Sequence, residues 1–230
     1  MKRREAVLFD LDGVLAPTER IKADAHIQTV KVLGGTVSEG LTRLYEKVIG
    51  VSHEATREAF LKSAGIVATP AMERDYTAIY RRIYAGLLNE LKETTPGATA
   101  LLQQLAIRGY RMGVVSSAHS KEVERILHQT NIHNYFDAIV SGNDVKEKKP
   151  APDPYLQALG LLAITADLAV AFEDTQTGVT AATRANLRVL AVRHSLNVLQ
   201  DLGSAHQVFN SLSDPSVLPS IERLLNCSSF

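Results

Sequence analysis

Hydrophobic and polar positions follow two different patterns along this chain. Short runs of consecutive apolar residues are typical of strands buried on both faces, whereas apolar residues at every third or fourth position are typical of amphipathic helices. The first pattern appears near the N-terminus and again several times after the middle of the chain. It predicts strands at Ala6–Phe9, Tyr110–Val115, Phe136–Val140, Leu168–Phe172 and Arg188–Val192.

The helical pattern fills the segment from Thr18 to about Lys92, where glycines interrupt it and no convincing strand appears. A stripe of tyrosines between Tyr76 and Tyr84 favours packing within this segment over ligand binding. Further helices are predicted between and after the later strands. We expect them at Ala98–Arg108, Lys121–Gln129, Asp153–Leu162, Gly178–Ala185 and Asp214–Leu225.

Strands that alternate with helices indicate a parallel sheet with right-handed crossover connections. The chain therefore predicts the α/β class, with a Rossmann-like parallel sheet core and an inserted α-helical cap domain. We expect the core to comprise residues 1–16 and 93–230, and the cap to comprise residues 17–92. Because the insertion follows the carboxyl end of the first strand, we expect it to cover that edge of the sheet as a lid.

Composition narrows the class of protein and its partners. The chain has 230 residues, with 25 Lys and Arg against 25 Asp and Glu, so its formal net charge is zero. A neutral chain favours neither nucleic acid nor an anionic membrane as a partner. No apolar stretch suits a signal peptide or a membrane span, and Cys227, the only cysteine, cannot form an internal disulfide. We expect a cytoplasmic protein, a monomer or small homo-oligomer, in which Cys227 is incidental.

Two carboxylates follow the first apolar run. Asp10 comes directly after Phe9, Asp12 lies one residue further, and Gly13 lets the backbone turn. The carboxyl ends of strands are where open α/β sheets place their sites. Two like charges held this close need a shared proton or a cation, and carboxylate oxygens suit Mg²⁺. The alternative is a strand that ends in an ordinary polar turn.

Two later segments offer groups that bind phosphate. Ser116 and Ser117 follow the second core strand, where a hydroxyl and backbone N–H groups can hold a phosphate oxygen. Lys149 precedes a proline-rich connection, and a lysine held rigidly can neutralise a transferring phosphoryl group. Lys148 stands beside it, which leaves open which lysine reaches the phosphate. The alternatives are a serine that caps the next helix and a solvated loop lysine.

Glu173 and Asp174 repeat the design of the first strand, with acids at a strand tip before a turn into a helix. Adjacent strand residues point to opposite sides. One acid can therefore bind a metal directly, while the other acts through water or a neighbouring group. The alternative is that Asp174 caps the following helix.

These segments resemble, in order and in position, the motifs of the haloacid dehalogenase superfamily, which begin with Asp-Leu-Asp-Gly-Val-Leu here. The helical insertion is similar to the type-one cap of the β-phosphoglucomutase and phosphoglycolate phosphatase-like branch. The resemblance implies that Asp10 is a nucleophile that forms an aspartyl-phosphate, and that Asp12 is the general acid and then the base. It also implies Mg²⁺ held by Asp10, the backbone carbonyl of Asp12 and Asp174, with Glu173 supporting.

The same resemblance implies which residues hold the substrate. Ser116 and Lys149 would hold the phosphoryl oxygens, with Ser117 as a further substrate ligand. In the cap, Lys22 stands where β-phosphoglucomutases place a histidine, and it is either a cation near the site or a surface lysine. Arg57 follows a stretch similar to the specificity loop of the cap, and it could bind a substrate anion.

Three functions compete on this evidence. The departure at Lys22 favours a Mg²⁺-dependent phosphatase that hydrolyses a small phosphorylated metabolite, such as a sugar phosphate or phosphoglycolate. The second is a β-phosphoglucomutase-like phosphosugar mutase, which would return the phosphoryl group to the sugar. The third is a non-enzymatic phosphate-binding or regulatory protein, and the complete set of catalytic residues argues against it.

Overall fold

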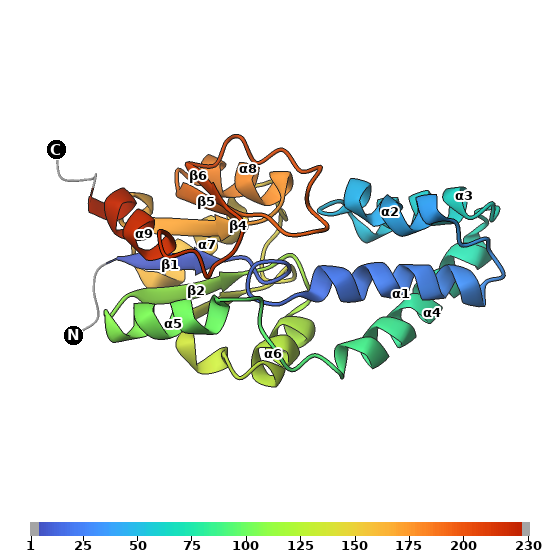
Figure 1. Cartoon of the computed structure of the whole chain (residues 1–230), viewed down its shortest axis with the longest axis horizontal. Helices are drawn as coiled ribbons and strands as arrows, with labels where there is room; N and C mark the ends of the chain where they lie inside the picture. Colours follow the sequence, from blue (N-terminus) through green and yellow to red (C-terminus); the bar gives the residue numbers. More distant parts are fainter. Residues whose placement is uncertain (1–4, 227–230) are drawn as a thin grey trace. The chain divides into compact units, whose positions relative to one another are not determined.

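The computed structural model describes residues 5–226, which divide into two compact units (Figure 1). We call the first the sheet unit; it contains the chain up to Pro17, Lys92–His194 and the chain from Gln200 onward. We call the second the helical unit; it contains Thr18–Leu91 and Ser195–Leu199. Cys227, which the sequence suggests is incidental, lies outside the described residues.

The sheet unit contains, within the described residues, six parallel strands in the order β3-β2-β1-β4-β5-β6. The strands are β1 (Ala6–Phe9), β2 (Arg111–Val115), β3 (Ala138–Val140), β4 (Ala169–Glu173), β5 (Arg188–Val192) and β6 (Gln207–Phe209). The predicted α/β class with a parallel, Rossmann-like core is therefore confirmed. The sequence does not predict β6, because this short strand includes the exposed Val208 and carries no apolar run.

β1 is central in the sheet and pairs with β2 on one side and β4 on the other (Figure 1). Phe9 is in register with Val114 of β2 and with Phe172 of β4. The buried rings of Phe9 and Phe172 stack with their centroids 5.2 Å apart, and such pairs add about 0.5–1.5 kcal/mol to the stabilisation from burial. This register places the next residues, Asp10 and Glu173, side by side at the carboxyl edge.

Helices and short 3-10 helices connect these strands, and one more helix follows the last strand. They are α5 (Ala98–Ile107), α6 (Ser120–Gln129), η1 (His133–Tyr135), α7 (Asp153–Leu162), η2 (Ala166–Leu168), α8 (Gln176–Arg184) and α9 (Val217–Asn226). Side chains of α7 and α8, such as Tyr155 and Val179, share one apolar cluster with Leu8 of β1. Burial of each such side chain stabilises the fold by about 1.5–3 kcal/mol, so these helices fix the sheet from which the site projects.

The helical unit is built from α1 (Thr18–Val32), α2 (Glu39–Val48), α3 (His53–Ser63) and α4 (Pro70–Leu88). Ser38, Ser52 and Thr69 cap α2, α3 and α4, because each side-chain oxygen accepts a 3.2 Å bond from a backbone N–H. Each cap contributes about 1 kcal/mol. Among residues 5–226, none of the helices combines the length and the apolar character needed to cross a bilayer.

Aromatic side chains fill the interior of the helical unit around His26. Its Nδ1 lies 2.8 Å from the Tyr76 hydroxyl, and its ring stacks on Tyr80 and Phe60 with centroids 4.2 and 4.8 Å away. The tyrosine stripe therefore packs inward, as expected from its spacing. Burial, and secondarily the charge of His53, lowers the pKa of His26 to about 3, so this ring is neutral in the folded protein at neutral pH.

Candidate active site

Asp10 lies at the carboxyl end of β1, where its backbone N–H donates to the carbonyl of Phe172 at 3.0 Å. Asp12, two residues further, is partly buried. Gly13 adopts a φ of +80°, which other residues rarely adopt. A Cβ atom at Gly13 would lie 2.2 Å from Oδ2 of Asp174. The turn therefore does more than end a strand, because its glycine allows the two acidic segments to approach.

Glu173 is the last residue of β4 and Asp174 follows it, and both are almost completely buried. Thr175 caps α8, because its hydroxyl accepts a 3.1 Å bond from the N–H of Gly178. The alternative role of Asp174 as the helix cap is thus wrong. Gly178 also leaves room for the first acid, since a Cβ there would lie 1.9 Å from Oε2 of Glu173. The local sequence Thr-Gln-Thr-Gly therefore supports both the helix start and the two carboxylates.

Lys149 reaches the same edge from the loop before α7. Its Nζ donates to Oδ1 of Asp10 at 2.5 Å and to Oε1 of Glu173 at 2.7 Å. A third bond, also 2.7 Å, goes to the backbone carbonyl of Val115 at the end of β2. The Lys149 side chain is only 5% exposed, whereas Lys148 is exposed. The alternative of a solvated loop lysine is therefore wrong for Lys149, and of the two lysines it is the one that contacts the acids.

Tyr155 and His194 also belong to this cluster and are not predicted from the sequence. The hydroxyl of Tyr155, on α7, donates to Oε1 of Glu173 at 2.6 Å. Nε2 of His194 lies 2.9 Å from Oδ2 of Asp174. His194 follows the carboxyl end of β5, so the rule that strand ends carry the site could have found it. Tyr155 gives no such signal, because it occupies an apolar position of an amphipathic helix.

Negative charge exceeds positive charge in this buried cluster. One ligand atom from each of Asp10, Glu173 and Asp174 lies within 4.8 Å of the others. Burial raises the pKa of Asp10 to about 8; Lys149 opposes this shift, while Glu173 and Asp12 add to it. Burial disfavours the charged form of Lys149, but the two carboxylates outweigh it and raise the pKa of this lysine. Oxygen donors with excess negative charge fit a hard divalent cation such as Mg²⁺.

Ser116 follows β2 and is buried at the same sheet edge. Its Oγ accepts a 3.1 Å bond from the N–H of Ala118, and its own N–H donates to the carbonyl of Val140 at 2.9 Å. The cap of α6 is His119, so the alternative that a serine caps this helix is wrong. Ser117, the next residue, is exposed. The two hydroxyls thus lie at the end of the strand that pairs with β1.

Lys22 lies on α1 of the helical unit. Its Nζ donates to Oε1 of Glu19 at 2.9 Å, and the other oxygen of Glu19 accepts a 2.6 Å bond from the Tyr45 hydroxyl. Lys22 is partly buried by this arrangement, unlike a freely solvated surface lysine. Its role as a substrate ligand stays a prediction.

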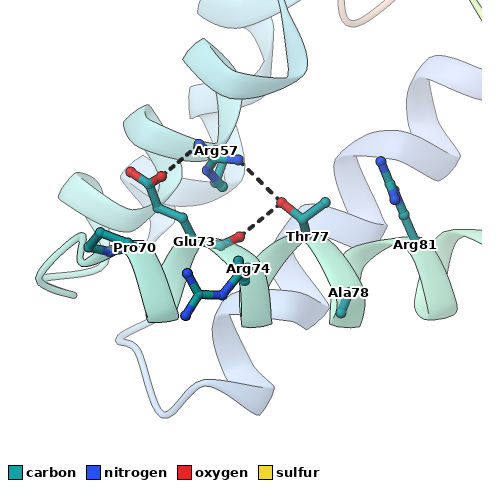
Figure 2. A pocket seen from close by; sticks show the side chains of 7 residues that line it. All are labelled: Arg57, Pro70, Glu73, Arg74, Thr77, Ala78 and Arg81. Atoms are coloured by element: carbon teal, nitrogen blue, oxygen red, sulfur yellow. Dashed lines mark hydrogen bonds and ion pairs between the residues drawn. The ribbon is translucent and has the colours of Figure 1, made fainter.

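Arg57 lies on α3 and reaches across to α4 (Figure 2). Its guanidinium donates to Oγ1 of Thr77 at 3.2 Å and to Oε2 of Glu73 at 3.1 Å. Its Nε is buried and meets no hydrogen-bond partner among the described residues. The pocket here has a volume of about 500 Å³ and is lined by Arg57, Pro70, Glu73, Arg74, Thr77, Ala78 and Arg81. Arginines exceed acids in this lining, which suits an anion, and the substrate role of Arg57 stays a prediction.

Comparison with known proteins places these features in a family. A family model described as haloacid dehalogenase-like hydrolase matches residues 7–192. The phosphorylated carbohydrates phosphatase of Thermotoga maritima is 30% identical over 197 residues, which cover 84% of this chain and 87% of that protein. The β-phosphoglucomutase of Bacillus subtilis is 30% identical over 193 residues, which cover 82% of this chain and 83% of that protein. The structure of CbbY from Rhodobacter sphaeroides in complex with phosphate matches with a TM-score of 0.77 at 26% identity, covering 95% of this chain and 99% of that one.

Proposed function

Because the chain belongs to the haloacid dehalogenase-like hydrolase family, we propose that it is a Mg²⁺-dependent phosphatase that works through an aspartyl-phosphate on Asp10. At the coarser level, it is a phosphatase of small phosphorylated metabolites, as its relationship to the Thermotoga enzyme supports. The observation that carries the finer proposal is the convergence of Lys149 on Asp10 and Glu173 at one buried sheet edge. A carboxylate can attack a phosphate ester only where the negative charge of both is offset.

In the first step, a carboxylate oxygen of Asp10 attacks phosphorus and the bond from phosphorus to the ester oxygen breaks. Asp12, two residues along the same turn, gives its proton to that leaving oxygen. Lys149 and Ser116 hold the phosphoryl oxygens during the transfer. In the second step, Asp12 takes a proton from water, which attacks phosphorus, releases inorganic phosphate and restores Asp10.

The metal would be held by the carboxylates of Asp10 and Asp174 and by the backbone carbonyl of Asp12. Glu173 would support this set, because it binds Lys149 and Tyr155 and so fixes the lysine beside Asp10. Bound there, Mg²⁺ would offset charge on the phosphoryl oxygens. His194 would orient Asp174 through the 2.9 Å contact between them.

The helical segment completes the proposal. We assign residues 1–16 and 93–230 to the core and residues 17–92 to a cap that selects the substrate. Within this cap, Lys22 and Arg57 would bind an anionic group of a sugar phosphate or a phosphoglycolate-like metabolite, and Ser117 would bind the substrate from the core. A neutral chain of this kind would work in the cytoplasm without nucleic acid or membrane partners, as a monomer or small homo-oligomer.

A phosphosugar mutase is the second candidate, because the β-phosphoglucomutase of Bacillus subtilis is as similar in sequence as the phosphatase. The two functions differ in the acceptor of the phosphoryl group. A phosphatase passes it to water, and a mutase returns it to the sugar. The lysine at position 22, in place of the histidine of the mutases, favours water as the acceptor.

The test is a panel of phosphorylated small metabolites, assayed with Mg²⁺ and with a chelator. The proposal expects inorganic phosphate to appear in stoichiometric amount with the dephosphorylated product, and to be absent when the metal is removed. Isomerised sugar phosphate without phosphate release would establish the mutase instead. Undiminished turnover in the chelator would contradict the dependence on Mg²⁺.

A further inference from the structure

A second group of metal-ligating side chains lies on the sheet unit and shares no residue with the acidic cluster. Glu124 and His128 are four residues apart on α6, so they occupy the same face of that helix. The chain then turns at Asn131, whose φ is +57°, and returns His133 to this face at the start of η1. One ligand atom from each of Glu124, His128 and His133 lies within 4.8 Å of the other two.

The spacing of these atoms matches a tetrahedral metal site. Oε2 of Glu124 lies 3.6 Å from Nε2 of His128 and 3.1 Å from Nε2 of His133. In a tetrahedral zinc site with bonds of about 2.0–2.1 Å, neighbouring ligand atoms are about 3.3–3.4 Å apart. The two observed separations bracket this value; because the imidazole planes are only 13° from parallel, one ring must rotate about its Cβ–Cγ bond to direct its lone pair at a shared ion.

All three side chains of this group offer a donor atom to one small region of space. Both imidazoles direct Nε2 at the same carboxylate oxygen of Glu124. Their rings stack with centroids 4.2 Å apart and planes 13° from parallel. Neutral imidazoles can each donate from Nε2 to this oxygen, and the same two nitrogens present lone pairs to an ion when the proton sits on Nδ1. A bound divalent ion instead uses the lone pairs of neutral rings and the charge of the carboxylate together.

One imidazole also has a partner for its second nitrogen. Nδ1 of His133 lies 3.5 Å from Oδ1 of Asn134, at the outer limit of a hydrogen bond. A proton on Nδ1 leaves Nε2 free to coordinate, which is how ligating histidines are usually oriented. The side chains of Glu124, His128 and His133 are 46%, 65% and 32% exposed, respectively. An ion can therefore enter from solvent, and water can fill a fourth position.

We propose that Glu124, His128 and His133 form a binding site for a borderline transition cation such as Zn²⁺. Imidazole nitrogens suit Zn²⁺, whereas the all-oxygen donors of the acidic cluster suit Mg²⁺, so the two sites select different ions. The ion joins the last turns of α6 to η1. Because it binds the folded chain, it stabilises this corner of the sheet unit.

The test is calorimetric titration of the full chain. Zn²⁺ is the titrant, and the buffer contains Mg²⁺ at a saturating concentration. Loss of an outer-shell partner weakens metal binding about 10- to 100-fold, so His128→Ala and His133→Ala should each weaken Zn²⁺ binding by at least that factor. Glu124→Gln keeps the shape of the side chain and should also weaken binding. His119→Ala, which removes an exposed histidine from the start of α6, is the matched control and should leave the affinity unchanged.

Two results would overturn the proposal. One is equal Zn²⁺ affinity in the wild type, His128→Ala, His133→Ala and Glu124→Gln. The other is loss of Zn²⁺ binding in Asp174→Asn together with its retention in the histidine variants, because this would assign the zinc to the acidic cluster. Thermal denaturation adds a second readout, in which Zn²⁺ should raise the melting temperature of the wild type and not that of His133→Ala.

Discussion

At the scale of single residues, some members of the candidate site stand out in the sequence. Others are recognised only from their contacts in the folded chain. Asp10 and Asp174 could be predicted because acids beside buried runs stand out from their surroundings, whereas Lys149 could be predicted only through the resemblance of its proline-rich segment to a family motif. Tyr155 could not be predicted, since it occupies an apolar position of a helix, whereas His194 could have been found from its place just after a strand. Their contacts depend on tertiary packing, which places a helix and a further strand end beside the acids.

The first prediction concerns Gly13. Gly13→Ala would combine an unfavourable positive φ, which costs about 1–2 kcal/mol, with a Cβ placed 2.2 Å from Oδ2 of Asp174. Gly34→Ala is a matched control, because Gly34 has a φ of +77° and no heavy atom within 4 Å of the added Cβ. We expect both variants to lose stability in chemical denaturation, and only Gly13→Ala to lose most of its phosphate release. Equal activity in the two variants would contradict this role for the close approach.

At the scale of elements, apolar runs and helical spacing locate most of the sheet and helices. β1, α7 and β5 have the bounds that the sequence predicts. Prolines mark the start of α7, and polar residues follow the ends of β1 and β5. The helix starts carry a weaker signal, since several residues near each start can act as a cap. His119 and Thr175 take this role, so Ser116 and Asp174 do not cap α6 and α8.

The second prediction concerns the packing of α1 on α4 through His26. The pKa of His26 is about 3 in the folded chain and about 6.5 when unfolded, so between these values only the unfolded chain binds the proton. The part of the free energy of unfolding that depends on a neutral His26 ring is fully present above pH 6.5. It falls as the pH drops toward 3, by up to about 1.4 kcal/mol per pH unit. Chemical denaturation between pH 4 and 7 should show that the free energy of unfolding rises less steeply with pH in His26→Phe than in the wild type.

The control for this pH dependence is Phe60→Leu, which loses packing beside His26 but removes no titrating group. It should keep the slope of the wild type. His53, whose pKa is also lowered by burial, adds to the total, so His26→Phe should reduce the slope without abolishing it. Identical slopes in the wild type and His26→Phe would show that His26 titrates normally in the folded chain.

At the scale of the whole molecule, the topology explains why residues far apart in sequence meet. Parallel strands present their carboxyl ends at one edge, so Asp10 and Glu173 come together, and Lys149 reaches them from the connection between β3 and β4. That these strand ends share one edge could be predicted from the alternation of strands and helices, whereas the pairing of β1 with β4, which brings Asp10 beside Glu173, could not. The lid role of residues 17–92 stays a prediction, because it depends on substrate and on movement that no pattern in the sequence specifies.

The third prediction follows from the excess negative charge at this edge. Mg²⁺ that binds only the folded chain should raise its stability, by about 2.7 kcal/mol when the ion is present at 100 times its Kd. Asp174→Asn removes a donor and one of the buried negative charges, so most of this increase should vanish. Thermal denaturation with Mg²⁺ and with a chelator measures the difference. Asp75→Asn, at an exposed acid of α4, should respond like the wild type, and an equal response in Asp174→Asn would contradict the assignment.

The most direct test of the account is phosphate release by wild type and by Asp10→Asn, with circular dichroism to show that both are folded. Asparagine keeps the shape of the side chain but cannot act as the nucleophile. Removal of a nucleophile can cost on the order of 10⁶-fold in kcat, and we expect a loss of at least about 10³-fold here. Turnover by Asp10→Asn within tenfold of the wild type would contradict an aspartyl-phosphate at this position.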